Sequence, residues 1–182
     1  MLRSPEPLSA AHLLDGFDSG VASLDDWLRR RALPNQTSGA PRTFVTHDAG
    51  RVVAYYALAA SAIATESAPG KFRRNMPDPI PVVVLGRLAI ARSHQGQGLG
   101  RAMFHDAARR IVQTADTIGI RGMLVHAISE EAKAFYLQLG LDPSPLDPMT
   151  LMVTIANLRA AIRLSQTHAA LPQVPAAGAS PI

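Results

Sequence analysis

The chain has 182 residues, of which 47% are hydrophobic and 18% are charged. This length suits one domain, or one domain with a tail, and the apolar content excludes a wholly disordered chain. There is no cysteine, which excludes disulfides, thiolate zinc sites and a cysteine nucleophile. No apolar run approaches the roughly 18 residues that a membrane span needs. Because the N-terminus also lacks an apolar signal core, we expect a cytoplasmic protein.

The basic residues are nearly all arginine. Lys and Arg together number 18 against 14 Asp and Glu, which gives a net charge of +4, and only Lys71 and Lys133 are lysine. Arginine binds phosphate and carboxylate through a planar fork, so the bias favours an anionic partner. Codon usage in a GC-rich genome would produce the same bias. The positions of the arginines must therefore decide between the two explanations.

The first regular element is expected to be a helix. Ser23 is a candidate N-cap, and apolar residues recur at helical spacing from Leu24 to Ala32. Pro34 is expected to end this helix, with a loop over residues 34–41.

A β-hairpin is expected next. Residues 43–45 are β-prone, an Asp-Ala-Gly turn occupies 48–50, and a second apolar run returns over 52–64. Residues 65–81 contain several prolines and predict a long irregular connection.

The run over residues 82–90 is apolar on both faces, which is typical of a central strand covered on both sides. Gly86 inside it indicates a bulge or a close backbone approach. The remaining elements are a helix over 98–117, a strand over 123–127, a helix capped by Ser129 and ended by Gly140, a strand over 149–155 and a short helix to about Leu164.

These elements predict a single α/β or α+β domain over residues 1–164, with a mostly antiparallel first half. Residues 165–182 contain three prolines and no Asp, Glu, Lys or Arg. We expect them to form a disordered tail.

The most informative segment is the glycine-rich turn Gln95–Arg101, which follows a buried strand and opens a helix. Backbone N–H groups at such a helix start form a cradle for phosphate. A nucleotide P-loop needs Gly-Lys-Ser/Thr, whereas Gly100 is followed here by Arg101 and Ala102. A dinucleotide fingerprint needs glycine where this chain has Arg101. Both of these motifs are therefore weak.

A third pattern fits completely: Gln-x-x-Gly-x-Gly, formed by Gln95, Gly98 and Gly100. With the buried strand before it, and the helix, strand and second helix after it, the segment resembles the pyrophosphate-binding loop of the GNAT superfamily, the Gcn5-related N-acetyltransferases. The resemblance implies the GNAT fold, with a mixed, mostly antiparallel sheet, splayed central strands and helices on both faces. It also implies acetyl-CoA as the cofactor.

The same resemblance implies the site. Tyr136 would act as the general acid that protonates the coenzyme A sulfur, and Gly86 would mark the bulge that splays the central strands. The residues expected to bind acetyl-CoA are Leu88, Ala89, Ile90, Gln95, Gly96, Gln97, Gly98, Leu99, Gly100, Arg101, Ser129, Ala132 and Phe135.

A general base is harder to identify. The two central strands carry no carboxylate, and His94 and His126 are the candidates, although a lone histidine beside a strand is more often structural. An α-amino group, with a pKa of about 7.7–8.0, is far less protonated at neutral pH than a lysine side chain at about 10.4. The missing carboxylate therefore favours an α-amine acceptor, for which no strong base is needed.

Seven of the cations before the glycine-rich turn lie in the part of such a domain that shapes the acceptor side. They are Arg29, Arg30, Arg31, Arg42, Lys71, Arg73 and Arg74. Each cluster alone could be a solvated face, but together they indicate a nucleic acid acceptor.

Further segments resemble the GNAT toxins of bacterial type II toxin–antitoxin modules. They include Phe17–Gly20, Leu24–Leu28, Arg42–Val45 and Leu85–Ile90. The resemblance implies acetylation of the α-amine of aminoacyl-tRNA, arrest of translation and neutralisation by a ribbon-helix-helix antitoxin. It leaves open whether the chain forms a homodimer, and it implies no metal. The alternatives are a GNAT enzyme acting on a small-molecule or protein amine, and a non-catalytic partner-binding module.

Overall fold

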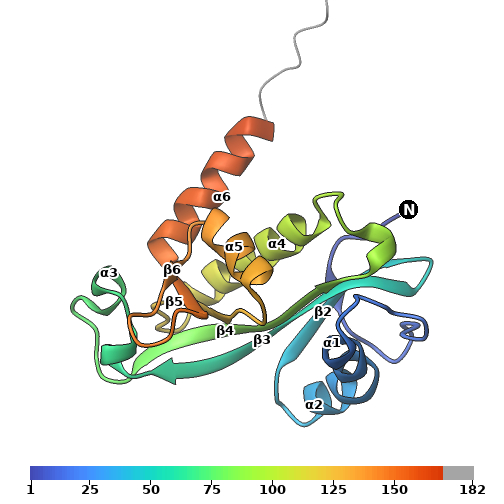
Figure 1. The fold of residues 1–182 in the computed structure, drawn as a ribbon, viewed down its shortest axis with the longest axis horizontal. Coiled ribbons are helices and arrows are strands. Elements are labelled where there is room, and N and C mark those ends of the chain that lie inside the picture. Colours follow the sequence, from blue (N-terminus) through green and yellow to red (C-terminus); the bar gives the residue numbers. More distant parts are fainter. Residues whose placement is uncertain (170–182) are drawn as a thin grey trace, which may run out of the picture.

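The computed structural model describes residues 1–169. Its strands form one sheet in the order β1-β2-β3-β4-β5-β7-β6 (Figure 1). The strands are β1 (Glu6–Pro7), β2 (Arg42–Asp48), β3 (Arg51–Ile63), β4 (Ile80–Ile90), β5 (Gly122–His126), β6 (Asp142–Pro143) and β7 (Thr150–Thr154). All neighbours pair antiparallel except β4 and β5, which are parallel. The expected mixed, mostly antiparallel sheet is confirmed.

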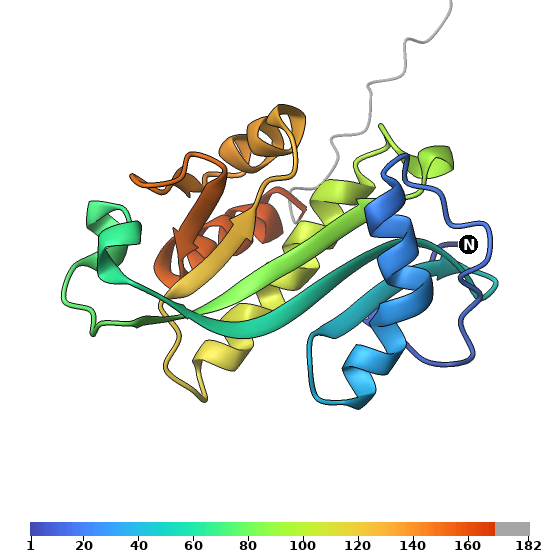
Figure 2. The same cartoon turned by 60° about the horizontal axis from the view of Figure 1, so that its bottom comes forward.

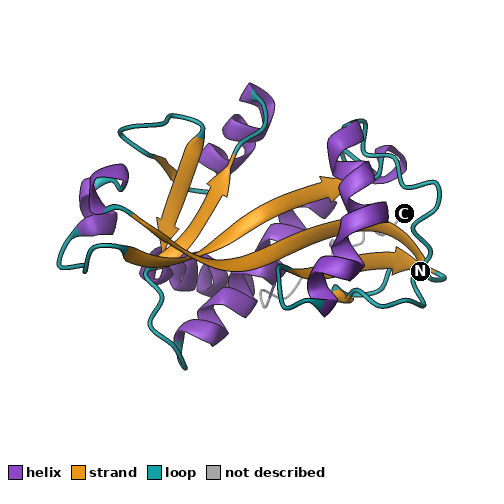
Figure 3. Ribbon diagram, turned by 90° about the horizontal axis from the view of Figure 1, so that it is seen from below, coloured by secondary structure: helices purple, strands orange, loops and turns teal. Residues whose placement is uncertain are grey.

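Helices cover both faces of this sheet (Figures 1 and 3). The α-helices are α1 (Ala22–Trp27), α2 (Leu33–Thr37), α3 (Gly70–Arg73), α4 (Leu99–Ala115), α5 (Glu130–Gln138) and α6 (Ile155–Ala169). Shorter turns are η1 (Leu28–Ala32), η2 (Thr65–Ser67) and η3 (Arg92–His94). One core lies between the sheet and α4, α5 and α6, and a second lies against α1 and η1. A smaller third core lies against α3. Within residues 1–169, no helix is both long and apolar enough to span a bilayer.

The two central strands separate part-way along their length. Strands β4 and β5 pair from Val82 opposite Gly122 to Leu85 opposite Val125, and their pairing ends there. Figure 2 shows β4 and β5 diverging beyond this point. Because β4 continues to Ile90 with only β3 beside it, its other edge is open to a ligand.

Gly86 is the bulged residue at this separation. The register of β3 and β4 jumps from Ala57 opposite Arg87 to Leu58 opposite Leu85, which leaves Gly86 without a partner. The expected bulge is confirmed. A Cβ on Gly86 would have only the Ala57 carbonyl oxygen near it, at 4.0 Å, so a close backbone approach is not the reason for glycine here.

The first helix differs from its prediction at both ends. Val21, not Ser23, is the N-cap, and it makes no side-chain cap hydrogen bond. Pro34 does not end the helix but lies in the first turn of α2, after the π-helical turn η1. Proline has no N–H to donate to the preceding turn, and the wider π turn accommodates its ring without ending the helix.

Two other boundaries were predicted wrongly. The connection over residues 65–81 is not wholly irregular, because it contains η2 and α3 and its last residues already belong to β4. Helix α6 runs to Ala169 and so includes the first residues of the expected tail. The rest of that tail, residues 170–182, lies outside the described residues.

Candidate active site

The glycine-rich turn has the backbone that its sequence predicts. Gly96 and Gly98 have φ values of +72° and +81°, in the left-handed region that side-chain-bearing residues rarely adopt. A Cβ at either glycine would meet nothing within 4 Å, so backbone conformation, not space, requires glycine. Gly98 is the N-cap of α4, whose first turn contains no acidic residue. The free N–H groups of this turn can therefore hold an anion.

Gln95 fixes the turn in place. Its side-chain Nε2 donates to the Ile90 carbonyl at 2.8 Å and to the Ser19 carbonyl at 2.9 Å. One amide thus joins the end of β4, the segment before α1 and the glycine-rich turn. The Gln95 side chain positions the backbone of the turn, and its N–H donors are already used.

A cavity of about 350 Å³ opens beside the free edge of β4. It is lined by Ser19, Val21, Leu24, Leu88, Ala89, Ile90, Gln95, Gly100, Ile128, Glu131, Ala132, Phe135 and Tyr136. The structure thus brings together eight of the residues that the sequence predicts, from β4, the turn and α5. The mainly apolar lining and the open strand edge fit the long pantetheine arm of acetyl-CoA.

The other predicted cofactor residues lie outside this lining. Gly96, Gln97, Gly98, Leu99 and Arg101 belong to the turn and the first turn of α4. The sixth, Ser129, caps α5, and its side-chain oxygen accepts the Ala132 N–H at 3.1 Å.

Sequence reasoning missed the lining residues that come from other elements. Ser19, Val21 and Leu24 reach the cavity from the segment around the start of α1, and Ile128 and Glu131 from around the start of α5. No local pattern singles out these residues, because only the packing of α1 and α5 against β4 brings them to the cavity.

Tyr136 is the one phenol in the cavity lining. It is 7% exposed, and burial raises the pKa of its hydroxyl above the ordinary value of about 10. The rings of Phe104 and Phe135 lie 6.3 Å and 5.2 Å from its ring. The hydroxyl therefore keeps its proton at neutral pH and is available as an acid.

Arg87 lies beside the same strand separation. Its guanidinium carbon stands 4.2 Å from the centroid of the Trp27 ring, and Trp27 in turn stacks on Tyr55. Among residues 1–169, no carboxylate forms an ion pair with Arg87. Arg87 thus has an aromatic partner, and none of its N–H donors is used by a hydrogen bond within residues 1–169.

The seven predicted nucleic acid cations are all exposed. They come from separate elements, η1, β2 and the region of α3. Arg29–Arg31, which we call the helical arginines, lie on η1. Lys71, Arg73 and Arg74 lie at α3, toward the other end of the long β3–β4 pair (Figure 2). Arg42 begins β2 and lines a groove beside α4. Arg29 is partly occupied, because it donates to Asp26 at 3.1 Å and to the Phe17 carbonyl at 3.0 Å.

Comparison with known proteins agrees with this geometry. The family model of the acetyltransferase (GNAT) domain matches residues 40–140. The chain belongs to the GNAT acetyltransferase family. It is 50% identical to a tRNA-acetylating toxin of Mycobacterium tuberculosis over 159 residues, which cover 87% of this chain and 96% of the relative.

Solved GNAT toxins share the fold. The structure of AtaT complexed with acetyl-methionyl-tRNAfMet has a TM-score of 0.81 and 28% identity, covering 88% of this chain and 98% of that one. A mutant of AtaT bound to the C-terminus of the antitoxin AtaR and acetyl-CoA has a TM-score of 0.77 and 27% identity, covering 90% and 99%. The expected GNAT fold is confirmed.

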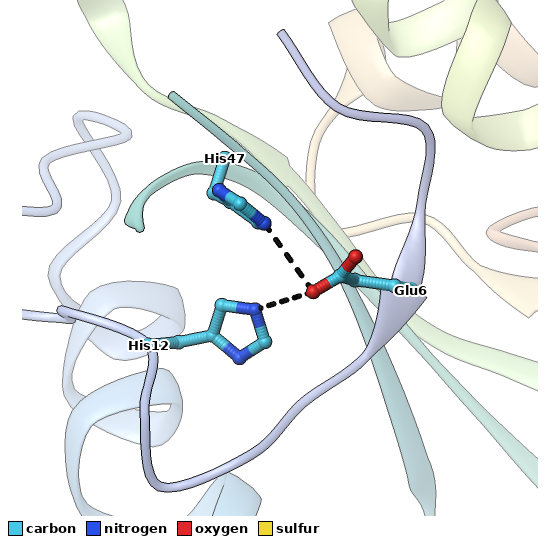
Figure 4. A group of neighbouring side chains, drawn as sticks. All are labelled: Glu6, His12 and His47. Carbon is cyan, nitrogen blue, oxygen red and sulfur yellow. Dashed lines mark hydrogen bonds and ion pairs between the residues drawn. The ribbon is translucent and has the colours of Figure 1, made fainter. Parts of the chain in front are cut away.

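A separate cluster near the N-terminus has the spacing of a metal site. Glu6 Oε1 lies 3.0 Å from His12 Nε2 and 3.3 Å from His47 Nε2 (Figure 4). However, each Nδ1 accepts a backbone N–H, from Ser9 and Gly50, at 3.0 Å. The protons of the neutral rings therefore sit on Nε2 and are donated to Glu6. A histidine that binds a metal donates its other ring N–H instead. The cluster of Glu6, His12 and His47, which we call the N-terminal tie, therefore links the N-terminal segment to β2 by hydrogen bonds.

Proposed function

We propose that this GNAT enzyme transfers an acetyl group from acetyl-CoA to the α-amine of aminoacyl-tRNA and so blocks translation. The observation that carries the proposal is the cavity at the separation of β4 and β5, which Tyr136 lines together with the strand edge at Leu88–Ile90 and the glycine-rich turn. The Mycobacterium tuberculosis relative, which is 50% identical to this chain, is a tRNA-acetylating toxin, and AtaT binds acetyl-methionyl-tRNA. Both relatives support this substrate class.

The chain's own groups have three tasks in this reaction. Acetyl-CoA supplies an acetyl group activated as a thioester. The glycine-rich turn and Arg101 would hold its pyrophosphate. The open edge of β4 at Leu88–Ile90 would hold its pantetheine arm and donate an N–H to the carbonyl oxygen as negative charge develops there. Tyr136, which burial and a raised pKa keep protonated at neutral pH, would give its proton to the departing sulfur.

The acceptor would reach this point from the face that carries α1 and α3. The helical arginines and the cations at α3 flank that face and would contact phosphates of the tRNA. Arg87, held by Trp27 with its N–H donors available, would meet the terminal nucleotides. Charged tRNA is cytoplasmic, so we propose that the enzyme works in the cytoplasm.

The decisive experiment is incubation with labelled acetyl-CoA and total charged tRNA. We expect label on the RNA fraction as N-acetyl-aminoacyl-tRNA, and none with deacylated tRNA. Tyr136→Phe should abolish transfer while binding acetyl-CoA as tightly as the wild type. A wild-type enzyme that leaves charged tRNA unlabelled, but labels a small amine or a protein, would refute the tRNA substrate.

We also propose that a ribbon-helix-helix antitoxin neutralises the enzyme. A mutant of AtaT bound to the C-terminus of the antitoxin AtaR supports an antitoxin as the partner. Co-expression with a ribbon-helix-helix protein encoded beside the enzyme should rescue growth and yield a copurifying complex. Sedimentation of the free enzyme will report whether it forms a homodimer.

A further inference from the structure

A second cavity, of about 340 Å³, lies on the other face of the sheet at the same strand separation. Its apolar wall includes Val84 and Leu124, which pair one residue before the pairing of β4 and β5 ends. Leu124 belongs to the core beside α3, whereas Tyr136 belongs to the core beside α4. Residues two apart on a strand point to the same face. His126 follows Val125, the last residue of β5 that pairs with β4, and therefore faces this second cavity, opposite Tyr136.

Three polar residues of this cavity form a chain of hydrogen bonds. His126 Nδ1 lies 2.8 Å from Thr150 Oγ1, which donates to Asp147 Oδ2 at 2.7 Å. Asp147 also accepts the Met149 N–H at 3.0 Å. The hydrogen bond from Thr150 and that from the Met149 backbone lower the pKa of Asp147, so its carboxylate is ionised and only accepts.

This chain of hydrogen bonds fixes the tautomer of His126. Thr150 has one hydroxyl proton and gives it to Asp147, so its oxygen must accept the proton of His126 Nδ1. In the neutral ring the lone pair is then on Nε2. The side chain is exposed, and Nε2 has no hydrogen bond to any of residues 1–169. The free lone pair therefore has a fixed direction, on a side chain that lines the second cavity.

We propose that His126 is the general base of the transfer, with Thr150 and Asp147 as positioning residues. The inference rests on the proposed function. The amine nitrogen bonds to the acetyl carbon and loses one proton to His126 Nε2, and the C–S bond breaks as the sulfur takes a proton from Tyr136. Proton return from His126 through solvent to the Tyr136 oxygen restores both groups. Thr150 and Asp147 hold the ring and exchange no net proton.

A positioned base contributes typically 10²–10⁴-fold to such a reaction. The sequence alone favours an α-amine acceptor, which needs no strong base. An imidazole is a weak base and therefore suits such an acceptor. The base removes the proton that the nitrogen must lose as the new bond forms, even when the attacking amine is neutral. The second cavity would then hold the aminoacyl side chain against Val84 and Leu124 while its amine meets His126.

The test compares two matched pairs of variants with labelled acetyl-CoA and total charged tRNA. We expect His126→Gln to lower kcat about 10²–10⁴-fold, with the acetyl-CoA Kd unchanged. His126→Gly should be equally slow and regain activity with added imidazole, which a merely structural histidine would not show. Thr150→Val, which has the shape but not the hydroxyl, should lower kcat, whereas Thr150→Ser should stay near the wild type.

The outcomes separate this inference from the proposed function. If the wild type does not acetylate charged tRNA, the proposed function fails. If it does, and His126→Gln keeps wild-type kcat, or a slow but folded His126→Gly gains nothing from imidazole, the base assignment is wrong.

Discussion

Asp106 connects α4 to the central sheet and offers a strong test of what holds this fold. It is 7% exposed. Its carboxylate accepts the Tyr56 hydroxyl, Arg110 Nε at 2.9 Å and Arg109 at 3.0 Å. Arg110 also donates to the Pro5 carbonyl at 2.9 Å. One carboxylate thus links α4, β3 and, through Arg110, the N-terminal segment.

We expect Asp106→Asn to destabilise the protein by about 2–4 kcal/mol. Hydrogen bonds to a charged group contribute about 1.5–3 kcal/mol each, and the bond to the exposed Arg109 side chain about 0–1 kcal/mol. Tyr56 and Arg110 both donate to Oδ2, so the amide oxygen of Asn can still accept from both, whereas its NH₂ group opposes Arg109. The two inner bonds lose the charge that strengthens them and fall to the roughly 0.5–1.5 kcal/mol of neutral hydrogen bonds. The estimate corresponds to a fall in Tm of roughly 5–15 °C for a domain of this size.

Thermal and urea unfolding monitored by circular dichroism measure this effect. Arg109→Gln is the matched control, because it removes a partner of Asp106 whose side chain is 57% exposed. It should change the stability by less than about 1 kcal/mol. A stability of Asp106→Asn within about 0.5 kcal/mol of the wild type would show that the buried carboxylate does not hold α4 to the sheet.

Four further predictions follow from the local geometry. Gly98→Ala should weaken acetyl-CoA binding in calorimetry and cost about 1–2 kcal/mol, since alanine must adopt positive φ, whereas Gly86→Ala should bind normally because its Cβ has room. Zinc or EDTA should leave Tm unchanged, because both histidine Nε2 atoms of the N-terminal tie carry protons and have no lone pair for a metal. Its contribution to stability should persist above the ordinary pKa of Glu6 and disappear as pH falls through the lowered one. Neutralising one of the helical arginines that contacts phosphate should reduce the salt slope of tRNA binding by about 1.

Several features of the fold could be predicted because short segments determine them. Ser129 caps α5 through a bond three residues away, and Gly140 ends that helix with a φ of +91°. The left-handed backbone of Gly96 and Gly98 is likewise a local property of the turn. The bulge at Gly86 could be predicted because a glycine in a doubly covered strand has few other uses.

Other features depend on contacts that the local sequence does not contain. Pro34 predicts the end of a helix, but the π turn before it allows the helix to continue. Ser19 and Ile128 line the cavity only because α1 and α5 pack beside β4. The three helical arginines and the three cations at α3 look alike in sequence, yet the fold places them at separate ends of β3–β4.

The candidate base shows why an absent residue type is weak evidence about mechanism. The central strands carry no carboxylate, and this favours an acceptor that needs no base. Yet Asp147, a carboxylate outside those strands, orients His126 through its hydrogen bond with Thr150. Thr150 lies only three residues after Asp147 in the chain. Because β5 ends one residue after its pairing with β4, and α5 begins soon after it, the segment from His126 to Tyr136 passes from one face of the separation to the other. The acid and the proposed base thus come from adjacent elements but open on opposite faces. An acetyl donor and an amine that enter from those two faces can meet only between the strands.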